Sequence, residues 1–295
     1  MSTNSGAREE LFMRLSLASQ LSKRSRIARI GTIPWKILFP KLLKTAHVSC
    51  RLNAGTFWGG KMNVILPEEV STVIWRYGYF EEQVCLFMLH YLQEGMCFVD
   101  IGAHFGFFTL FGNYLVGKKG RVFSFEPTPS AYQQLLRSTA NCPNVQAYNC
   151  GVFSEESEIK FYDYGLEKSA CNSVFGTRIK GHSLNARKAL LVRARTVDNV
   201  IKEEGCREVH FVKIDAESSE IHVLRGMTET LKTHRPYIAI EVGDFGIDGV
   251  PTSEEIVAWL QEMGYIPYEV RNGECVRHNK KTYYEYGNLL FMPDI

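Results

Sequence analysis

Two glycines and two carboxylates are closely spaced between residues 98 and 126. Segment 98–106 places Gly102 and Gly106 four residues apart, after an apolar run and before a helical one. A glycine turn at the carboxyl end of a strand lets the backbone approach a ligand closely. Glu126 follows twenty residues after Gly106, at a place where a carboxylate can accept hydrogen bonds from both ribose hydroxyls of an adenosine.

Dinucleotides and S-adenosylmethionine both bind at sites with this layout. Asp100 distinguishes between them, because we expect its carboxylate to point into the glycine turn. A pyrophosphate would be repelled there, and the turn lacks the three-glycine G-x-G-x-x-G spacing of dinucleotide sites. S-adenosylmethionine has no phosphate, and an anion attracts its ammonium and sulfonium. The prediction is an S-adenosylmethionine site formed by Asp100, Gly102, Gly106 and Glu126. His104, in the same turn, is a further cofactor contact or a structural histidine.

Two alternatives to this cofactor site stay open at the level of the sequence. An NAD-dependent oxidoreductase would use the same order of strand, glycine turn, helix, strand and acid. A tight turn from strand to helix that carries a surface acid would need no ligand at all.

A second group of acids follows two later apolar runs. Segment 212–220 contains Asp215, Glu217 and Glu220, and Glu241 ends the run that follows it. Carboxyl ends of parallel strands share one rim of a sheet, so these acids should lie near the cofactor. Methyl transfer needs an in-line nucleophile and a base that removes a hydroxyl proton. We predict Asp215, Glu217 and Glu241 as catalytic, with no metal, and a helix N-terminus as the alternative role of Glu217 and Glu220.

The elements that must position these residues alternate between strand-like and helical runs, which is typical of βαβ units in an α/β fold with a parallel sheet. Strands are expected at 97–101, 121–125, 145–152, 158–164, 191–195, 209–215, 237–242, 266–270 and 288–291. Helices are expected at 81–93, 107–116, 129–141, 196–204, 219–232 and 253–263. The last helix should start at Ser253 without a capping box. A long polar loop over 165–191 is expected to be functional.

The first 46 residues carry nine Lys or Arg and two Glu, a local charge of +7 that leaves about −5 for the rest of the chain. Residues 8–46 mix these cations with apolar residues, and we expect Pro34 and Pro40 to break the helical pattern. The favoured interpretation is a solvated cap on the main domain, and the alternative is peripheral contact with an anionic membrane. We therefore divide the chain into a basic, partly helical extension over 1–60 and a main domain over 61–295.

The amino-acid composition indicates where in the cell the protein works and which binding partners it has. The eight cysteines are scattered without a C-x-x-C pair, which is typical of reduced thiols in a cytoplasmic protein. The start of the chain does not have the pattern of a signal peptide. A mildly acidic main domain argues against nucleic acid as a partner, because a phosphate backbone requires a basic face. The prediction is a cytoplasmic protein, with membrane contact through residues 8–46 as the alternative.

Several segments together resemble the FkbM-type methyltransferases in order and spacing. They are residues 77–81, 98–106, 122–127, 195–198, 212–220, 223–226 and 235–241. The resemblance covers roughly residues 74–242. It implies a Rossmann-like class I methyltransferase fold, a doubly wound and mostly parallel sheet with an antiparallel C-terminal strand, formed by residues 61–295. It also implies S-adenosylmethionine as methyl donor, with Asp100, Gly102 and Glu126 as cofactor positions.

The acceptor that this resemblance implies is a hydroxyl of a sugar, a glycan, a glycolipid or a secondary metabolite. Two residues depart from the family pattern: His104 stands where the family generally has Asn, and Ser218 stands where it has Gly. Together with the basic N-terminus, Ser218 leaves one non-catalytic alternative, a membrane-surface or interaction module on a Rossmann-like scaffold.

Overall fold

The structure, a computed structural model, describes residues 3–165, 174, 188–271 and 273–294. The predicted loop over 165–191 therefore lies largely outside the described residues. Within the described part, no helix combines the length and the apolar character needed to cross a bilayer.

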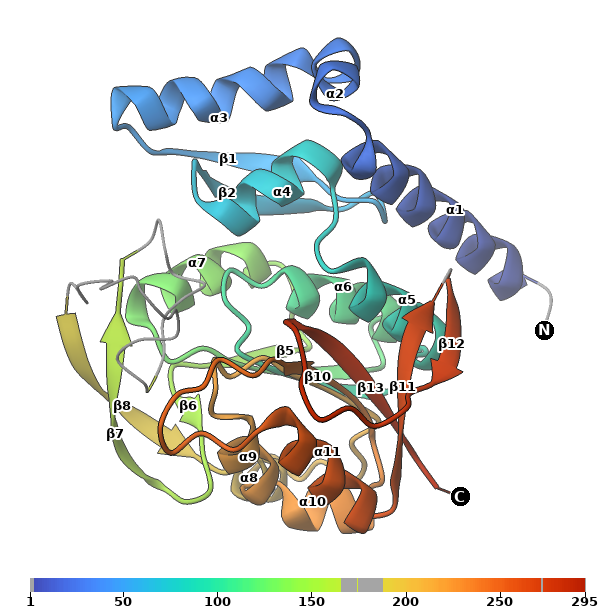
Figure 1. The fold of residues 1–295 in the computed structure, drawn as a ribbon, viewed down its shortest axis with the longest axis vertical. Helices are drawn as coiled ribbons and strands as arrows, with labels where there is room; N and C mark the ends of the chain where they lie inside the picture. The colour runs from blue at the N-terminus through green and yellow to red at the C-terminus, as the bar shows by residue number, and fades with distance from the viewer. Residues whose placement is uncertain (1–2, 166–173, 175–187, 272, 295) are drawn as a thin grey trace.

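An eight-stranded sheet forms the centre of the molecule (Figure 1). Its order is β12-β11-β13-β10-β9-β3-β4-β5, with β13 antiparallel to its neighbours β10 and β11 and with β3, β4, β5, β9 and β10 parallel. This confirms the predicted doubly wound, mostly parallel sheet with an antiparallel C-terminal strand. The strands are β3 (Cys97–Ile101), β4 (Arg121–Phe125), β5 (Val145–Tyr148), β9 (Phe211–Ile214), β10 (Tyr237–Val242), β11 (Tyr265–Arg271), β12 (Glu274–Arg277) and β13 (Gly287–Pro293).

Helices cover both faces of this sheet, which explains why the central strands read as continuous apolar runs. Each face has its own buried cluster of side chains, and β3 supplies both, with Phe98 on one face and Val99 on the other. One face carries α5 (Glu82–Tyr91), α6 (Phe107–Val116) and α7 (Pro129–Thr139). The other face carries α8 (Val197–Glu203), α9 (Glu220–Arg225), α10 (Thr228–Thr233) and α11 (Ser253–Glu262).

Several elements differ from the sequence predictions in their bounds or their caps. The helix expected over 219–232 is two helices, and a Cβ at Gly226 between them would lie 2.0 Å from the Phe153 carbonyl oxygen. The strand expected over 145–152 is β5 plus β6 (Gly151–Val152). The prediction that α11 has no capping box was wrong: its N-cap is Thr252, whose side chain accepts from the backbone N–H of Glu255 while the Glu255 side chain accepts in return.

A small second sheet lies beside the central one. It has the order β6-β8-β7, with β7 (Ser157–Asp163) antiparallel to β8 (Lys188–Arg195). Gly151 and Val152 of β6 and Phe161 of β7 line the cavity described below. This sheet therefore forms one wall of the candidate site.

The N-terminal part forms a layer of helices and one hairpin above the sheet (Figure 1). Its elements are α1 (Thr3–Lys23), α2 (Arg26–Thr32), α3 (Pro34–Ala46), β1 (Cys50–Gly55), β2 (Lys61–Leu66) and α4 (Glu69–Tyr77). Helix α1 packs on α5 through the buried Leu11 and Leu15, and the guanidinium of Arg8 donates to the carbonyls of Leu89 and Leu92 at the end of α5. This layer is held to the main domain by apolar and polar contacts.

The prediction that Pro34 and Pro40 break the helical pattern is confirmed at Pro34, because α2 ends at Thr32 and α3 begins at Pro34, and it was wrong at Pro40. Pro34 occupies the first turn of α3, where its missing N–H costs nothing, and Pro40 lies inside the helix. A proline at position 40 leaves the carbonyl of Lys36 without its helical donor. The Nε of Arg76 in α4 donates to that carbonyl at 3.3 Å, so a tertiary contact replaces the lost hydrogen bond.

Candidate active site

A cavity of about 320 Å³ opens at the carboxyl ends of β3, β4 and β9. Its size is within the range of small-molecule sites. Five of the predicted site residues line it: Gly102, His104, Glu126, Asp215 and Glu217. Asp100, Gly106 and Glu241 lie outside its lining. The roof comes from the N-terminal layer, through Met62 of β2 and Val70 and Ile74 of α4.

Both predicted glycines occupy positions that a side chain would obstruct. Gly102 has φ +72°, and a Cβ there would lie 1.8 Å from the carbonyl oxygen of Asp215. Gly106 has φ +92°, and its Cβ would lie 2.7 Å from Cδ1 of Leu135. The lack of a side chain at Gly102 lets the end of β3 approach the end of β9 closely. The lack of one at Gly106 lets α7 pack against the start of α6.

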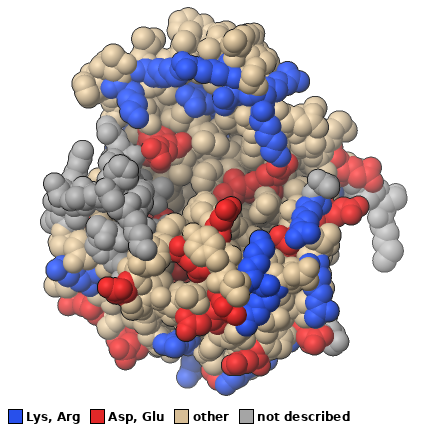
Figure 2. Space-filling model, viewed as in Figure 1, with Lys and Arg blue, Asp and Glu red and all other residues tan. Residues whose placement is uncertain are grey.

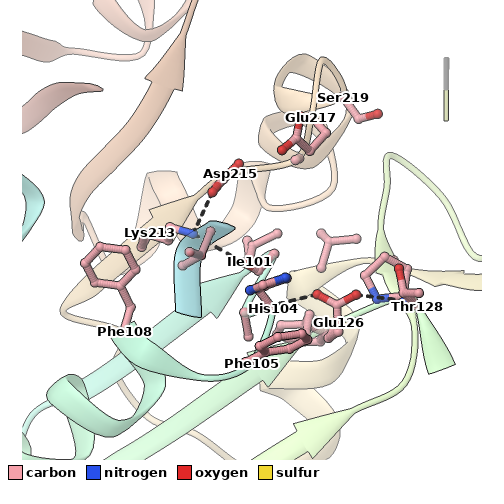
Figure 3. Close-up of a pocket in the computed structure, with 18 of the residues that line it drawn as sticks. Ile101, His104, Phe105, Phe108, Glu126, Thr128, Lys213, Asp215, Glu217 and Ser219 are labelled. Atoms are coloured by element: carbon pink, nitrogen blue, oxygen red, sulfur yellow. Dashed lines mark hydrogen bonds and ion pairs between the residues drawn. The ribbon is translucent and has the colours of Figure 1, made fainter. Parts of the chain in front are cut away.

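The carboxylate of Glu126 is held by the glycine turn and by its own loop (Figure 3). One oxygen accepts from the backbone N–H of His104 and the other from that of Thr128, both at 2.9 Å. Burial raises the pKa of Glu126 to about 7, although the backbone donors of Thr128 and His104 act in the opposite direction. The carboxylate therefore lines the cavity in a position fixed by two N–H groups.

His104 adopts a left-handed backbone conformation with φ +50°. Asn, Asp and His tolerate this region better than other residues with side chains. Its ring stacks on Phe105 with centroids 3.9 Å apart, and burial lowers its pKa to about 4. A neutral imidazole beside the cavity is the state that this environment favours.

Asp100 does not point into the glycine turn, and that part of the prediction was wrong. It is fully buried, and its Oδ2 accepts from the hydroxyl of Thr109 in α6 at 2.6 Å. Strand register explains the orientation, because Asp100 is paired with Ser124 of β4 and with Lys213 of β9. Residues in register on parallel strands share a face, so the three side chains form a polar row under α6.

Lys213 is the cation of this row, and the sequence analysis did not single it out. Its ammonium donates to Asp215 Oδ2 at 3.1 Å and to the carbonyl of Gly102 at 3.3 Å (Figure 3). Burial lowers the pKa of Lys213, but the carboxylates of Asp215, Asp100 and Glu81 outweigh that effect and raise it. A lysine inside the apolar run of β9 was the available signal, since a buried lysine requires an anion nearby.

Three carboxylates converge beside Lys213. One oxygen each of Glu81, Asp215 and Glu241 lies within 4.8 Å of the other two. Glu81, the second residue that the sequence analysis did not single out, precedes α5 and has φ +43°. Burial and the charge of Asp215 raise its pKa to about 7. The hydroxyl of Tyr286, another lining residue, bonds to Glu241, which connects this carboxylate to the cavity.

The loop between β9 and α9 has two consecutive residues with positive φ, Glu217 at +52° and Ser218 at +79°. Oε1 of Glu220 accepts from the backbone N–H groups of Ala216 and Ser218, at 3.2 and 3.1 Å. The helix-terminus interpretation is therefore confirmed for Glu220. Glu217 instead lines the cavity, as expected of a site residue (Figure 3).

Comparison with models of protein families identifies the family of this chain. The family model of the methyltransferase FkbM domain matches residues 100–267, more than half of the chain. The chain belongs to the FkbM methyltransferase family. The match begins at Asp100 and ends in β11, so it includes the glycine turn and Glu126 and excludes Glu81 and the N-terminal layer. The predicted family resemblance is confirmed.

Individual FkbM-related proteins are similar over part of their length. Hexuronic acid methyltransferase AglP of Haloferax volcanii is 24% identical over 163 residues, 55% of this chain and 62% of that protein. Methyltransferase sdnD of Sordaria araneosa is 26% identical over 44% of this chain and 60% of that protein. A crystal structure of methyltransferase FkbM from Methylobacillus flagellatus has 15% identity and a TM-score of 0.42, covering 77% of this chain and 56% of that one. The chain thus spans less than two thirds of each of these proteins.

Proposed function

We propose that this protein is an S-adenosylmethionine-dependent O-methyltransferase. The observation that supports it most directly is the cavity at Gly102 and Glu126, which lies at the carboxyl edge of the sheet inside the FkbM domain. Open α/β sheets bind their ligands at this edge. Bound S-adenosylmethionine would supply an electrophilic methyl group on its sulfonium.

The residues present suit that cofactor. The missing Cβ of Gly102 leaves room for the Asp215 carbonyl, and the backbone of Gly102 lines the cavity, so a ligand can lie against the turn. A carboxylate has about four acceptor positions. The two backbone N–H groups and the Thr128 hydroxyl use three of them at Glu126, which keeps capacity for a ribose hydroxyl. His104 and Gly106 complete the turn, and Asp100 acts from behind it through the ammonium of Lys213.

The acidic side of the cavity is the proposed acceptor site. Asp215 and Glu217 line it and can accept hydrogen bonds from the hydroxyl to be methylated. Lys213 forms an ion pair with Asp215 at 3.1 Å, whereas Glu81 has a pKa near 7 and suits proton transfer at neutral pH. We assign removal of the hydroxyl proton to the cluster of Glu81, Asp215 and Glu241.

The proposed mechanism uses no metal. Three carboxylates are also a possible site for a hard cation, but the ammonium of Lys213 already neutralises Asp215 from inside the cluster. Methyl transfer should therefore be unchanged by EDTA and by added Mg²⁺. A requirement for a divalent cation would overturn the assignment of the cluster as a base.

The proposed acceptor is a small molecule or a carbohydrate. The name of AglP, a hexuronic acid methyltransferase, supports a sugar acceptor. Nucleic acid is not expected, because the chain outside the first 46 residues has a net charge of about −5. The cytoplasmic location and the division at residue 60 stay predictions, and the hairpin of β1 and β2 spans that residue.

Isothermal titration tests the cofactor assignment. Purified protein should bind S-adenosylmethionine and S-adenosylhomocysteine, and NAD should not compete. Glu126→Ala should weaken both by about tenfold or more, because a hydrogen bond to a charged group contributes about 1.5–3 kcal/mol. Glu94→Ala, at an exposed glutamate away from the cavity, is the matched control and should bind normally. Tighter binding of NAD than of S-adenosylmethionine would contradict the proposal and would favour the NAD-dependent oxidoreductase instead.

A further inference from the structure

Exposed large apolar side chains gather on the N-terminal helices. Among the described residues, those that are clearly exposed in this region are Met13, Leu17, Ile27, Trp35, Leu38, Leu42 and Val48. Only five other large apolar or aromatic residues of the described part are similarly exposed, and none of them lies in the N-terminal helices. Single exposed apolar residues are normal, but a contiguous group marks an interaction surface.

Helix α3 is apolar on two opposite sides. Ile37 and Pro40 are buried against the rest of the protein. Trp35, Leu38 and Leu42 have the spacing i, i+3, i+7, which places them on one face. Their exposures are 72%, 43% and 60%. A helix that serves only as a solvated cap needs the buried apolar side. It has no use for exposed apolar residues on the opposite side.

Positive charge lies beside this apolar face, in a stretch of sequence that has no acid. No Asp or Glu occurs between residues 11 and 67. Within the described part of the chain, Arg24, Arg26, Lys41 and Lys44 are exposed and make no ion pair. Figure 2 shows a row of Lys and Arg across the N-terminal helices, with only uncharged residues above it in this view. The surface therefore combines exposed apolar residues with a neighbouring row of cations.

We propose that the outer face of α2 and α3 docks on an anionic lipid bilayer. Trp35, Leu38 and Leu42 enter the interface between headgroups and acyl chains, where a tryptophan ring is well suited. Lys41, at the edge of this face, and the two arginines contact the anionic headgroups. A bilayer matches both the apolar and the cationic part of this surface, whereas a soluble acidic partner would leave the three large side chains without a counterpart.

Helix α4 lies between the docking face and the cavity. On its inner side α3 packs against α4, and Val70 and Ile74 of α4 line the cavity. A docked bilayer would thus lie one layer of helices away from the cavity. Docking itself does not depend on the proposed chemistry, so failure of one leaves the other standing.

Vesicle flotation of the full chain tests the proposal. The protein should float with vesicles of phosphatidylcholine and phosphatidylglycerol at 3:1, and at least tenfold less with phosphatidylcholine alone. Salt at 0.5 M should weaken the binding, since it screens the charges. Equal binding to both vesicles, or to neither, would overturn the proposal.

Two variants separate the contributions of the surface. The triple change Trp35→Ala, Leu38→Ser and Leu42→Ser should lower binding to anionic vesicles at least tenfold. The double change Arg26→Glu and Lys41→Glu should abolish the preference for anionic vesicles. Leu191→Ser is the matched control, because Leu191 is 73% exposed on β8, and it should bind as the unaltered protein does.

Folding and self-association are controlled in the same samples. The variants should keep the thermal midpoint and the S-adenosylmethionine affinity of the unaltered protein, because the changed side chains are exposed and lie outside the cavity. If light scattering shows a dimer that the triple change dissociates, and vesicles do not bind, the face is an interface between two copies and the proposal is wrong.

Discussion

Single carboxylates set the pH dependence expected of cofactor binding. The pKa of Glu126 in the folded protein is about 7, above its ordinary value of 4.5, because the side chain is buried. In the proposed complex a ribose hydroxyl donates to the ionised form, so protonation competes with binding. Affinity for S-adenosylmethionine should rise with pH up to about 7 and then level, with a limiting slope of tenfold per pH unit. Titration calorimetry between pH 5.5 and 8.5 measures it.

The same pKa has the opposite effect on the stability of the free protein. A folded-state pKa above the unfolded value gives a contribution that is fully present below pH 4.5 and is lost as pH rises through about 7. Glu126→Gln removes the titrating group and should flatten the affinity profile at a weaker level. A variant that keeps the slope would show that another group causes it.

Glu81 should govern the rate rather than cofactor affinity. Its pKa of about 7 arises from burial and from the nearby charge of Asp215. Glu81→Gln should lower kcat about 10²- to 10⁴-fold, the usual contribution of a general base, and should remove the acid limb of the kcat profile. Glu82→Gln is the control, because Glu82 pairs with Lys23 at the surface. Loss of cofactor binding in Glu81→Gln would instead indicate a structural role.

Ser218 stores backbone strain. Its φ of +79° is in the region that favours glycine, and a residue with a side chain pays about 1–2 kcal/mol there. Ser218→Gly should therefore raise the free energy of unfolding by about 1 kcal/mol in urea titration. Ser219→Gly is the matched control: with φ −106° it has no such strain to relieve, and it should lose stability. A loss in both variants would contradict the argument.

At the scale of elements, the ends of β3 and β9 approach each other closely at Gly102. Gly102→Ala would place a Cβ 1.8 Å from the Asp215 carbonyl oxygen and should destabilise by about 3 kcal/mol while abolishing cofactor binding. Gly95→Ala is matched in conformation, with φ +87° and no atom within 4 Å of its Cβ. It should cost only the backbone strain, about 1 kcal/mol. Equal losses in chemical denaturation would show that the close approach does not matter.

At the scale of the whole molecule, the N-terminal layer and the main domain share one core. Leu11 and Leu15 of α1 belong to the same buried cluster as Phe87, Phe98 and Leu290. Calorimetry should therefore give one cooperative unfolding transition. S-adenosylmethionine at one hundred times its Kd should raise the free energy of unfolding by about 2.7 kcal/mol. Two transitions, of which the cofactor moves only one, would mean that the layer unfolds independently.

The sequence by itself determined the fold class, the glycine turn and the carboxylate after β4. These features are local: a strand, a turn and a helix follow one another within a few residues, and right-handed βαβ connections then fix which strand ends meet. The strained Ser218 was also visible as a departure from the family pattern. Gly102, Glu126, Asp215 and Glu217 line one cavity as that reasoning expected.

Only the tertiary structure decided which face each polar side chain of the sheet takes. Strands buried on both faces carry no polar and apolar alternation, so the sequence does not reveal that Asp100 turns to Thr109. The meeting of Glu81, Lys213 and Glu241 depends in the same way on contacts between distant segments. Pro40 was misjudged for a related reason, since the donor that replaces its missing N–H comes from Arg76 in another helix.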